Sequence, residues 1–103
     1  MIRGTTPTLI FTIPYMAEQI EAGFITFAQR GSVCFEKELD DEDVEVSDHV
    51  IQVYLSQEET LMLSDVAKLK VQIRLRLAGE GDKAVASQIM ETSVGAILKG
   101  GVI

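Results

Sequence analysis

The sequence predicts an all-β protein, an antiparallel β-sandwich with one or two short helical turns. Several short segments alternate apolar and polar residues with a period of two, which directs successive side chains to opposite faces of a strand. Turn-forming residues separate these segments, and no helical pattern of ten or more residues lies between them. Hydrophobic residues make up 47% of the 103 residues, which is enough apolar material for one core. We therefore expect a single domain over residues 1–103.

The first expected strand covers residues 8–13. Its alternate residues Leu9, Phe11 and Ile13 are predicted to face the core. Proline follows directly and ends the strand, because it has no backbone N–H to donate. A short helical turn is expected over residues 16–21.

A hairpin comes next along the chain. Residues 24–29 and 33–38 are rich in aromatic and β-branched side chains, which suit a pleated surface. Between them, the Arg-Gly-Ser sequence at 30–32 predicts a tight turn. A further strand is expected at 50–55, with its odd-numbered residues directed inward.

A capping box marks the second helical turn. Ser56 and Glu59 have the spacing at which each side chain accepts a hydrogen bond from the other residue's free backbone N–H group. One or two helical turns are expected to follow, with Leu61 or Leu63 reaching the core.

The clearest strand signal lies at residues 69–77. Every odd position is Leu, Val or Ile and every even position is Lys, Gln or Arg, so one face is expected to be buried and the other solvated. A Gly-Glu-Gly-Asp turn at 79–82 precedes a last strand at 83–92. Residues 94–103 are apolar and punctuated by glycine, and form either an extra strand or an arm that packs on a neighbour.

Several function classes are disfavoured by the residues present. Cys34 is the only cysteine and His49 the only histidine, so the sequence offers neither a disulfide nor a set of zinc ligands. We expect no catalytic site, no cofactor and no metal. The net charge of −7 argues against nucleic-acid binding. No apolar stretch is long enough for a membrane span, and no signal peptide is visible.

An acidic segment at residues 36–48 contains eight Asp and Glu residues and one lysine, and so accounts for the whole net charge. A solvated hairpin loop is the favoured interpretation. A charged contact surface centred on Asp40, Asp41, Glu42 and Asp43 is the second, and a calcium site the third, although the EF-hand spacing and its glycine are missing.

Four of the nine basic residues, Lys68, Lys70, Arg74 and Arg76, share one face of the strand at 69–77. Nucleic-acid platforms on sheets combine such cations with exposed aromatic rings, and none is expected on this face. A solvated face that discourages edge pairing is favoured. A further hypothesis is that this stripe meets the acidic segment of a neighbouring subunit, which high salt would weaken.

Five segments together suggest a family: residues 8–14, 25–27, 55–60, 71–74 and 97–103. They resemble small prophage proteins of Gram-positive bacteria, and the layout is similar to the immunoglobulin-like N-terminal module of phage baseplate upper proteins. The resemblance implies an immunoglobulin-like sandwich, and a virion or tail-associated structural part without an active site. The acidic segment is longer than in that module and no receptor-binding extension follows, so direct host recognition is not expected.

The leading hypothesis is therefore a non-enzymatic phage structural or assembly protein. We expect a homo-oligomer that contacts other virion proteins through edge strands and the tail, with Ile97 and Leu98 among its contacts. It would reside in the host cytoplasm during assembly and then in the virion. Two alternatives remain: a small ligand-binding sandwich, which normally needs exposed Trp or Tyr, and an acidic accessory protein that binds a partner through residues 36–48.

Overall fold

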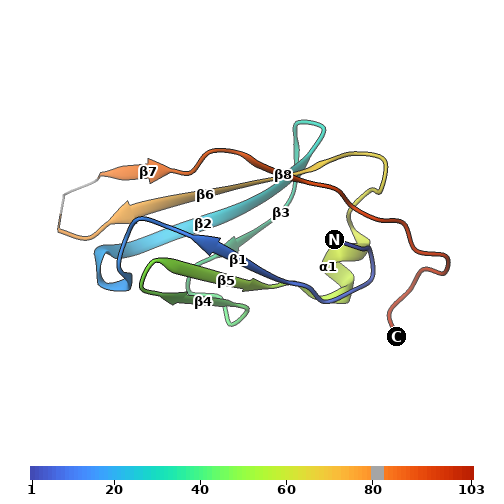
Figure 1. The fold of residues 1–103 in the computed structure, drawn as a ribbon, viewed down its shortest axis with the longest axis horizontal. Helices are drawn as coiled ribbons and strands as arrows, with labels where there is room; N and C mark the ends of the chain where they lie inside the picture. Colours follow the sequence, from blue (N-terminus) through green and yellow to red (C-terminus); the bar gives the residue numbers. More distant parts are fainter. Residues whose placement is uncertain (80–82) are drawn as a thin grey trace.

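A computed structural model describes residues 1–79 and 83–103 of the chain. Within these residues two antiparallel sheets face one another and enclose the core, which confirms the predicted all-β, sandwich-like class (Figure 1). The elements in chain order are β1 (Thr8–Thr12), η1 (Ala17–Gln19), β2 (Ile20–Gln29), β3 (Ser32–Glu38), β4 (Val44–Ser47), β5 (Val50–Tyr54), α1 (Gln57–Leu61), β6 (Leu69–Leu77), β7 (Ala84–Ala86) and β8 (Met90–Thr92).

The smaller sheet has the order β1-β5-β4, and the larger one has the order β3-β2-β6-β7. Strand β8 also pairs with β6, alongside a different part of that strand from β7. The sandwich is open on the side where β1 of the smaller sheet lies near β7 and β8 of the larger sheet, because β1 does not pair with either strand. The molecule is elongated and flat, measuring 49 × 26 × 17 Å.

The predicted alternation of β6 is confirmed. All of its odd-numbered residues are buried, and Lys70, Arg74 and Arg76 are exposed on the opposite face. Ile51 and Val53 of β5 are also fully buried, as expected, and close the core from the other sheet. Burial of such aliphatic side chains is the main favourable contribution to folding, and each contributes roughly 1.5–3 kcal/mol.

The β2–β3 hairpin forms at the predicted turn, where Arg30 and Gly31 both have positive φ angles of 54° and 78°. That pair of angles is typical of a two-residue turn whose twist matches the strands it joins. One irregularity follows. Phe27 pairs with Phe35 but Ala28 pairs with Val33, so Cys34 is the extra residue of a β-bulge.

Both helical turns occur where the sequence predicts them. Ser56 accepts a hydrogen bond from the Glu59 amide at 3.1 Å, and the Glu59 carboxylate accepts one from the Ser56 amide at 2.9 Å. This capping box begins α1, and of the two candidates for the core it is Leu63 that is buried, at 1% exposure. The 3-10 turn η1 confirms the turn expected at 16–21.

Two predictions of secondary structure were wrong. The acidic segment is not simply a loop, because Val44–Ser47 form β4 and pair with β5. The last strand is interrupted at Ser87, whose hydroxyl oxygen accepts the hydrogen bond from the Ile73 amide at 3.0 Å. A side-chain acceptor therefore replaces a backbone carbonyl, and the ladder divides into β7 and β8. The turn expected at 79–82 falls largely on residues 80–82, outside those described.

The tail is an arm rather than an additional strand. Val94 is buried, and Gly95 makes a single parallel bridge with Ile2. Beyond Gly95 the chain runs outward past α1 (Figure 1). Among the described residues, no helix is long and apolar enough to cross a membrane.

Candidate interaction surfaces

The acidic segment contains a buried cation that the sequence pattern did not reveal. Lys37 of β3 is only 4% exposed, and its ammonium group lies 3.0 Å from the Asp43 carboxylate and 2.9 Å from that of Glu59. Burial lowers the pKa of Lys37, but the hydrogen bonds and charges of Glu59 and Asp43 outweigh it, so the pKa lies above its usual 10.5. These three side chains tie β3 to the following turn and to α1.

Most of the other acids in this segment also have internal contacts. The Asp41 carboxylate accepts a hydrogen bond from the Glu38 amide at 2.9 Å, and Asp48 accepts one from the Ala17 amide at 2.9 Å. Glu36 accepts one from the Thr26 hydroxyl at 3.0 Å. The favoured prediction of a solvated loop was therefore incomplete, because these carboxylates organise the backbone around β3 and β4.

The predicted contact surface at 40–43 is divided between two roles. All four residues are exposed, but Asp41 and Asp43 also make the internal contacts just described. The charge of Asp40 and its hydrogen bond to Glu38 raise the pKa of the Glu38 carboxyl group. Within residues 1–79 and 83–103, no group of three or more Asp, Glu, His or Cys side chains is placed to hold a metal ion.

The basic stripe lies on the outer face of the larger sheet. Lys70 and Arg76 each face an acid, at 3.9 Å from Glu91 and 3.3 Å from Glu21 respectively, and both pairs are half exposed. Exposed pairs of this kind contribute only about 0–1 kcal/mol. Lys68 is exposed just before β6 begins.

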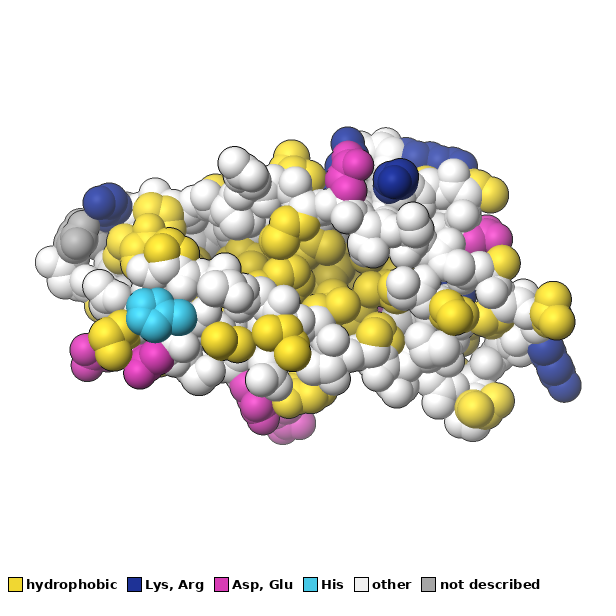
Figure 2. All heavy atoms as spheres, in the orientation of Figure 1, with side chains coloured by type: hydrophobic (Ala, Val, Ile, Leu, Met, Phe, Trp, Pro, Cys, Tyr) yellow, Lys and Arg dark blue, Asp and Glu magenta, His cyan; other side chains and the backbone are white. Residues whose placement is uncertain are grey.

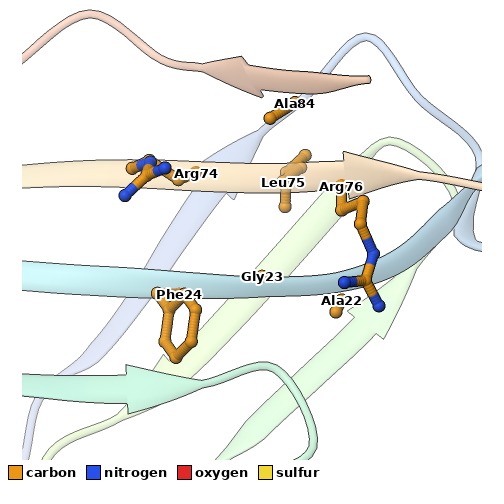
Figure 3. Close-up of a pocket in the computed structure, with 7 residues that line it drawn as sticks. All are labelled: Ala22, Gly23, Phe24, Arg74, Leu75, Arg76 and Ala84. Carbon is orange, nitrogen blue, oxygen red and sulfur yellow. The ribbon is translucent and has the colours of Figure 1, made fainter. Parts of the chain in front are cut away.

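The expectation that this face lacks an exposed aromatic ring was wrong. Phe24 of β2 is 44% exposed and is the cross-strand partner of Arg74. The two side chains flank a shallow hollow of about 200 Å³, whose rim includes the small residues Ala22 and Ala84 (Figure 3). The run Phe-Ile-Thr-Phe at 24–27 is apolar at both parities, so the pattern alone could not show which ring points outward.

Two apolar hollows follow one another along the open edge of the sandwich. The first, of about 280 Å³, lies between β1 and β8, and the second, of about 200 Å³, lies between the end of β1 and β7. Leu9 and Val71 line the first, and Ile13 and Ile73 the second. Figure 2 shows hydrophobic side chains gathered in the middle of this face, between the two sheets. Apolar side chains that are only partly buried, such as Leu9 and Phe11, thus border an edge where backbone groups are also unpaired.

The tail presents further apolar side chains to solvent. Ile97 is half buried beside Gly4 and Leu61, whereas Leu98 is fully exposed. At the end of the described chain, the Ile103 amide donates to the Gln57 side chain at 2.8 Å. The predicted contact residues Ile97 and Leu98 therefore differ in exposure, and only Leu98 is free to meet another surface.

Cys34 and His49 occupy structural positions. Cys34 is half buried at the bulge, and its Sγ lies 3.8 Å from the Gln29 side-chain oxygen. His49 has a positive φ of 62° in the β4–β5 turn, and its Nδ1 lies 3.3 Å from the Ile13 carbonyl oxygen. Within residues 1–79 and 83–103, neither side chain hydrogen-bonds to a side chain that could act as an acid or base.

Comparisons with protein families, curated proteins and solved structures found no match for this chain.

Proposed function

We propose that this protein is a non-enzymatic structural or assembly subunit of a phage or prophage particle, associated with the tail or baseplate. The observation that carries the assembly role is the open edge of the sandwich, where apolar hollows line the gap between β1 and the β7–β8 edge. Exposed apolar surface beside unpaired strand edges is typical of protein–protein contact sites. The resemblance of its strand segments to prophage proteins supports the phage setting.

The tail is the second element of this proposal. Leu98, Val102 and Ile103 expose their side chains to solvent at 108%, 57% and 104% of reference values. Such a segment gains burial only by covering another surface, and the open edge of a neighbouring subunit offers one. When one patch meets a different patch on the next copy, identical subunits form a closed ring if the rotation closes and an open filament if it does not.

The test compares the full chain with a truncation that ends at Thr92, using size-exclusion chromatography with light scattering. A defined oligomer that falls to a smaller species on truncation supports assembly through the tail. The double substitution of Leu98 and Ile103 by serine removes two exposed apolar side chains and keeps the chain length. It therefore separates loss of apolar contact from loss of the segment itself. An oligomer unchanged in both variants would contradict the role of the tail.

The phage setting needs a separate measurement. If the protein is a virion component, mass spectrometry of purified particles from its induced host should detect it at a fixed ratio to the other tail proteins. Absence from intact particles, with the protein present in the lysate, would contradict a virion role.

An acidic accessory protein is less well supported than a structural subunit. The carboxylates of Asp41, Asp43 and Asp48 accept hydrogen bonds within the chain, so fewer acidic groups remain for a partner. Neutralising Asp40 and Glu42 leaves those contacts in place. Loss of partner binding in that variant, with folding intact, would favour the accessory role.

A further inference from the structure

The outer face of the five-stranded sheet carries charges in separate rows. Strand β3 places Glu36 and Glu38 on this face, and β6 places its cations there, while β2 lies between them. Along the middle of β2 the residues on this face, Phe24, Thr26 and Ala28, are uncharged, and Glu21 near its start pairs with Arg76. An acidic row and a basic row therefore run along the sheet on either side of a neutral row.

The strand register aligns members of the three rows. Phe24 pairs with Glu38 on one side and with Arg74 on the other, so these three residues form one line across the sheet. Thr26 likewise pairs with Glu36 and with Gln72. Neighbouring strands lie about 4.8 Å apart, so about 10 Å separates the backbones of Glu38 and Arg74.

The central charges of both rows are incompletely balanced within the chain. Arg74 is exposed, and no acid among the described residues forms an ion pair with it. Glu38 is surrounded by Asp40, Asp41 and Glu36, and their repulsion raises the pKa of its carboxyl group. An external cation near Glu38 and an external anion near Arg74 would each relieve this imbalance.

We propose that two copies of the chain pack these outer faces together about a two-fold axis parallel to β2. Rotation about such an axis reverses the order of the strands across the sheet, so β3 of each copy lies over β6 of the other. Glu38 of each copy then meets Arg74 of its partner, and the contact occurs twice. An axis perpendicular to the strands would instead place acid over acid and base over base, which charge repulsion disfavours.

The neutral row fits the centre of this contact. Phe24 lies close to the axis, and the hollow of about 200 Å³ beside it offers space for the ring of the partner. Its lining includes Ala22 and Ala84, whose side chains lack the bulk to fill it (Figure 3). An aromatic residue in a pocket at the centre of an interface is a common source of binding energy.

The size of the face is compatible with a specific dimer. Four adjacent strands and the nine residues of β6 span roughly 500 Å² on each copy, given the usual strand spacing and rise. The pair would bury roughly 1,000 Å² in total, near the lower limit for specific interfaces. The contact uses neither the tail nor the open edge, so it goes beyond the assembly role proposed above and is independent of it.

The test is a charge exchange between the two rows. Arg74→Glu alone and Glu38→Arg alone each place like charges together at both contacts, and each should weaken dimerisation at least about a hundredfold. The double variant carries Arg at 38 and Glu at 74, keeps the native net charge and should restore the dimer. Sedimentation velocity at protein concentrations up to about 1 mM measures this, with Glu58→Arg on α1 as a matched surface reversal that should have no effect.

Three outcomes would overturn the inference. The first is a native chain that stays monomeric over this concentration range, and the second is a dimer that tolerates both single reversals. The third is a double variant that stays monomeric although circular dichroism shows it is folded. A dimer that ignores the reversals but is lost on truncation at Thr92 would contradict this inference and leave the tail-mediated assembly intact.

Discussion

Phe24 and Phe27 lie three residues apart on the same strand and have opposite environments. Phe27 is completely buried and stacks on Phe35 with ring centroids 4.6 Å apart, whereas Phe24 is 44% exposed on the outer face. The cations on either side of the sheet differ in the same way. Lys37 is enclosed by Asp43 and Glu59, while Arg74 has no such partner among the described residues.

This contrast separates what stabilises the fold from what is available for contact. The inner face satisfies its apolar and charged groups within one chain, so changes there should appear as lost stability. The outer face leaves its ring and its charges accessible, so changes there should appear in association and hardly in stability.

The largest expected effect comes from the buried ring. Phe27→Ala should lower the free energy of unfolding by about 3–5 kcal/mol, because it leaves a cavity in the core. Phe24→Ala should change it by no more than about 0.5 kcal/mol. Urea unfolding of the two variants, followed by circular dichroism under conditions where both are monomeric, measures the difference. Equal losses in the two variants would remove the distinction between the faces.

Gly23 tests how closely the two central strands approach. A Cβ atom at this position would lie 2.5 Å from the Arg74 carbonyl oxygen and 2.9 Å from a methyl group of Leu75. Gly23→Ala should therefore lower the free energy of unfolding by about 2–3 kcal/mol, since backbone atoms cannot move aside cheaply. Thermal unfolding checks this, with Gly100→Ala as the control, because a Cβ there meets nothing within 4 Å. A neutral Gly23→Ala variant would mean that the strands can separate.

The two cations should respond differently to neutralisation. Lys37→Met should lower the free energy of unfolding by about 1–2 kcal/mol, less than for a fully buried pair because Asp43 and Glu59 are 57% and 23% exposed and can be hydrated. Arg74→Met should change it by less than about 0.5 kcal/mol. Urea midpoints compare the two directly. A larger loss for Arg74→Met would mean that the outer charge has an internal role.

The smallest expected effect is the pH dependence of the Lys37 contribution. Because the pKa of Lys37 is raised on folding, its stabilising contribution is fully present below pH 10.5 and is lost as pH rises through the folded value. The stability difference between native protein and Lys37→Met should therefore narrow above about pH 10.5. Comparing the two proteins at each pH cancels the contribution to stability of other groups that titrate in this range, such as Tyr54. A gap that stays constant to about pH 12 would contradict the role of the charge.

The sequence predicted those elements whose pattern is strict. The alternation at 69–77 identifies both the strand and its buried face, because one parity is entirely apolar and the other entirely polar. The capping box at Ser56 is equally local, since its two hydrogen bonds join residues three apart. Such features depend on neighbours in sequence and need no knowledge of tertiary contacts.

The features that were missed depend on distant partners. Strand β4 is short and lies between acids, so only its pairing with β5 identifies it. In the sequence Lys37 is simply the one basic residue among eight acids. Its burial depends on Glu59, which lies twenty-two residues further along the chain. The outward orientation of Phe24 follows from the register of three strands. Periodicity identifies faces, but it does not identify which strands are neighbours.

The bulge at Cys34 has a consequence for how this hairpin tolerates changes in length. A deletion of one residue between Ser32 and Cys34 can be absorbed by removing the bulge, which leaves every residue after Phe35 on its present face. The same deletion after Phe35 would rotate the rest of the strand by half a turn, directing Lys37 to solvent and Glu38 into the core. The start of β3 can therefore lose one residue, whereas the segment that follows Phe35 must keep its length.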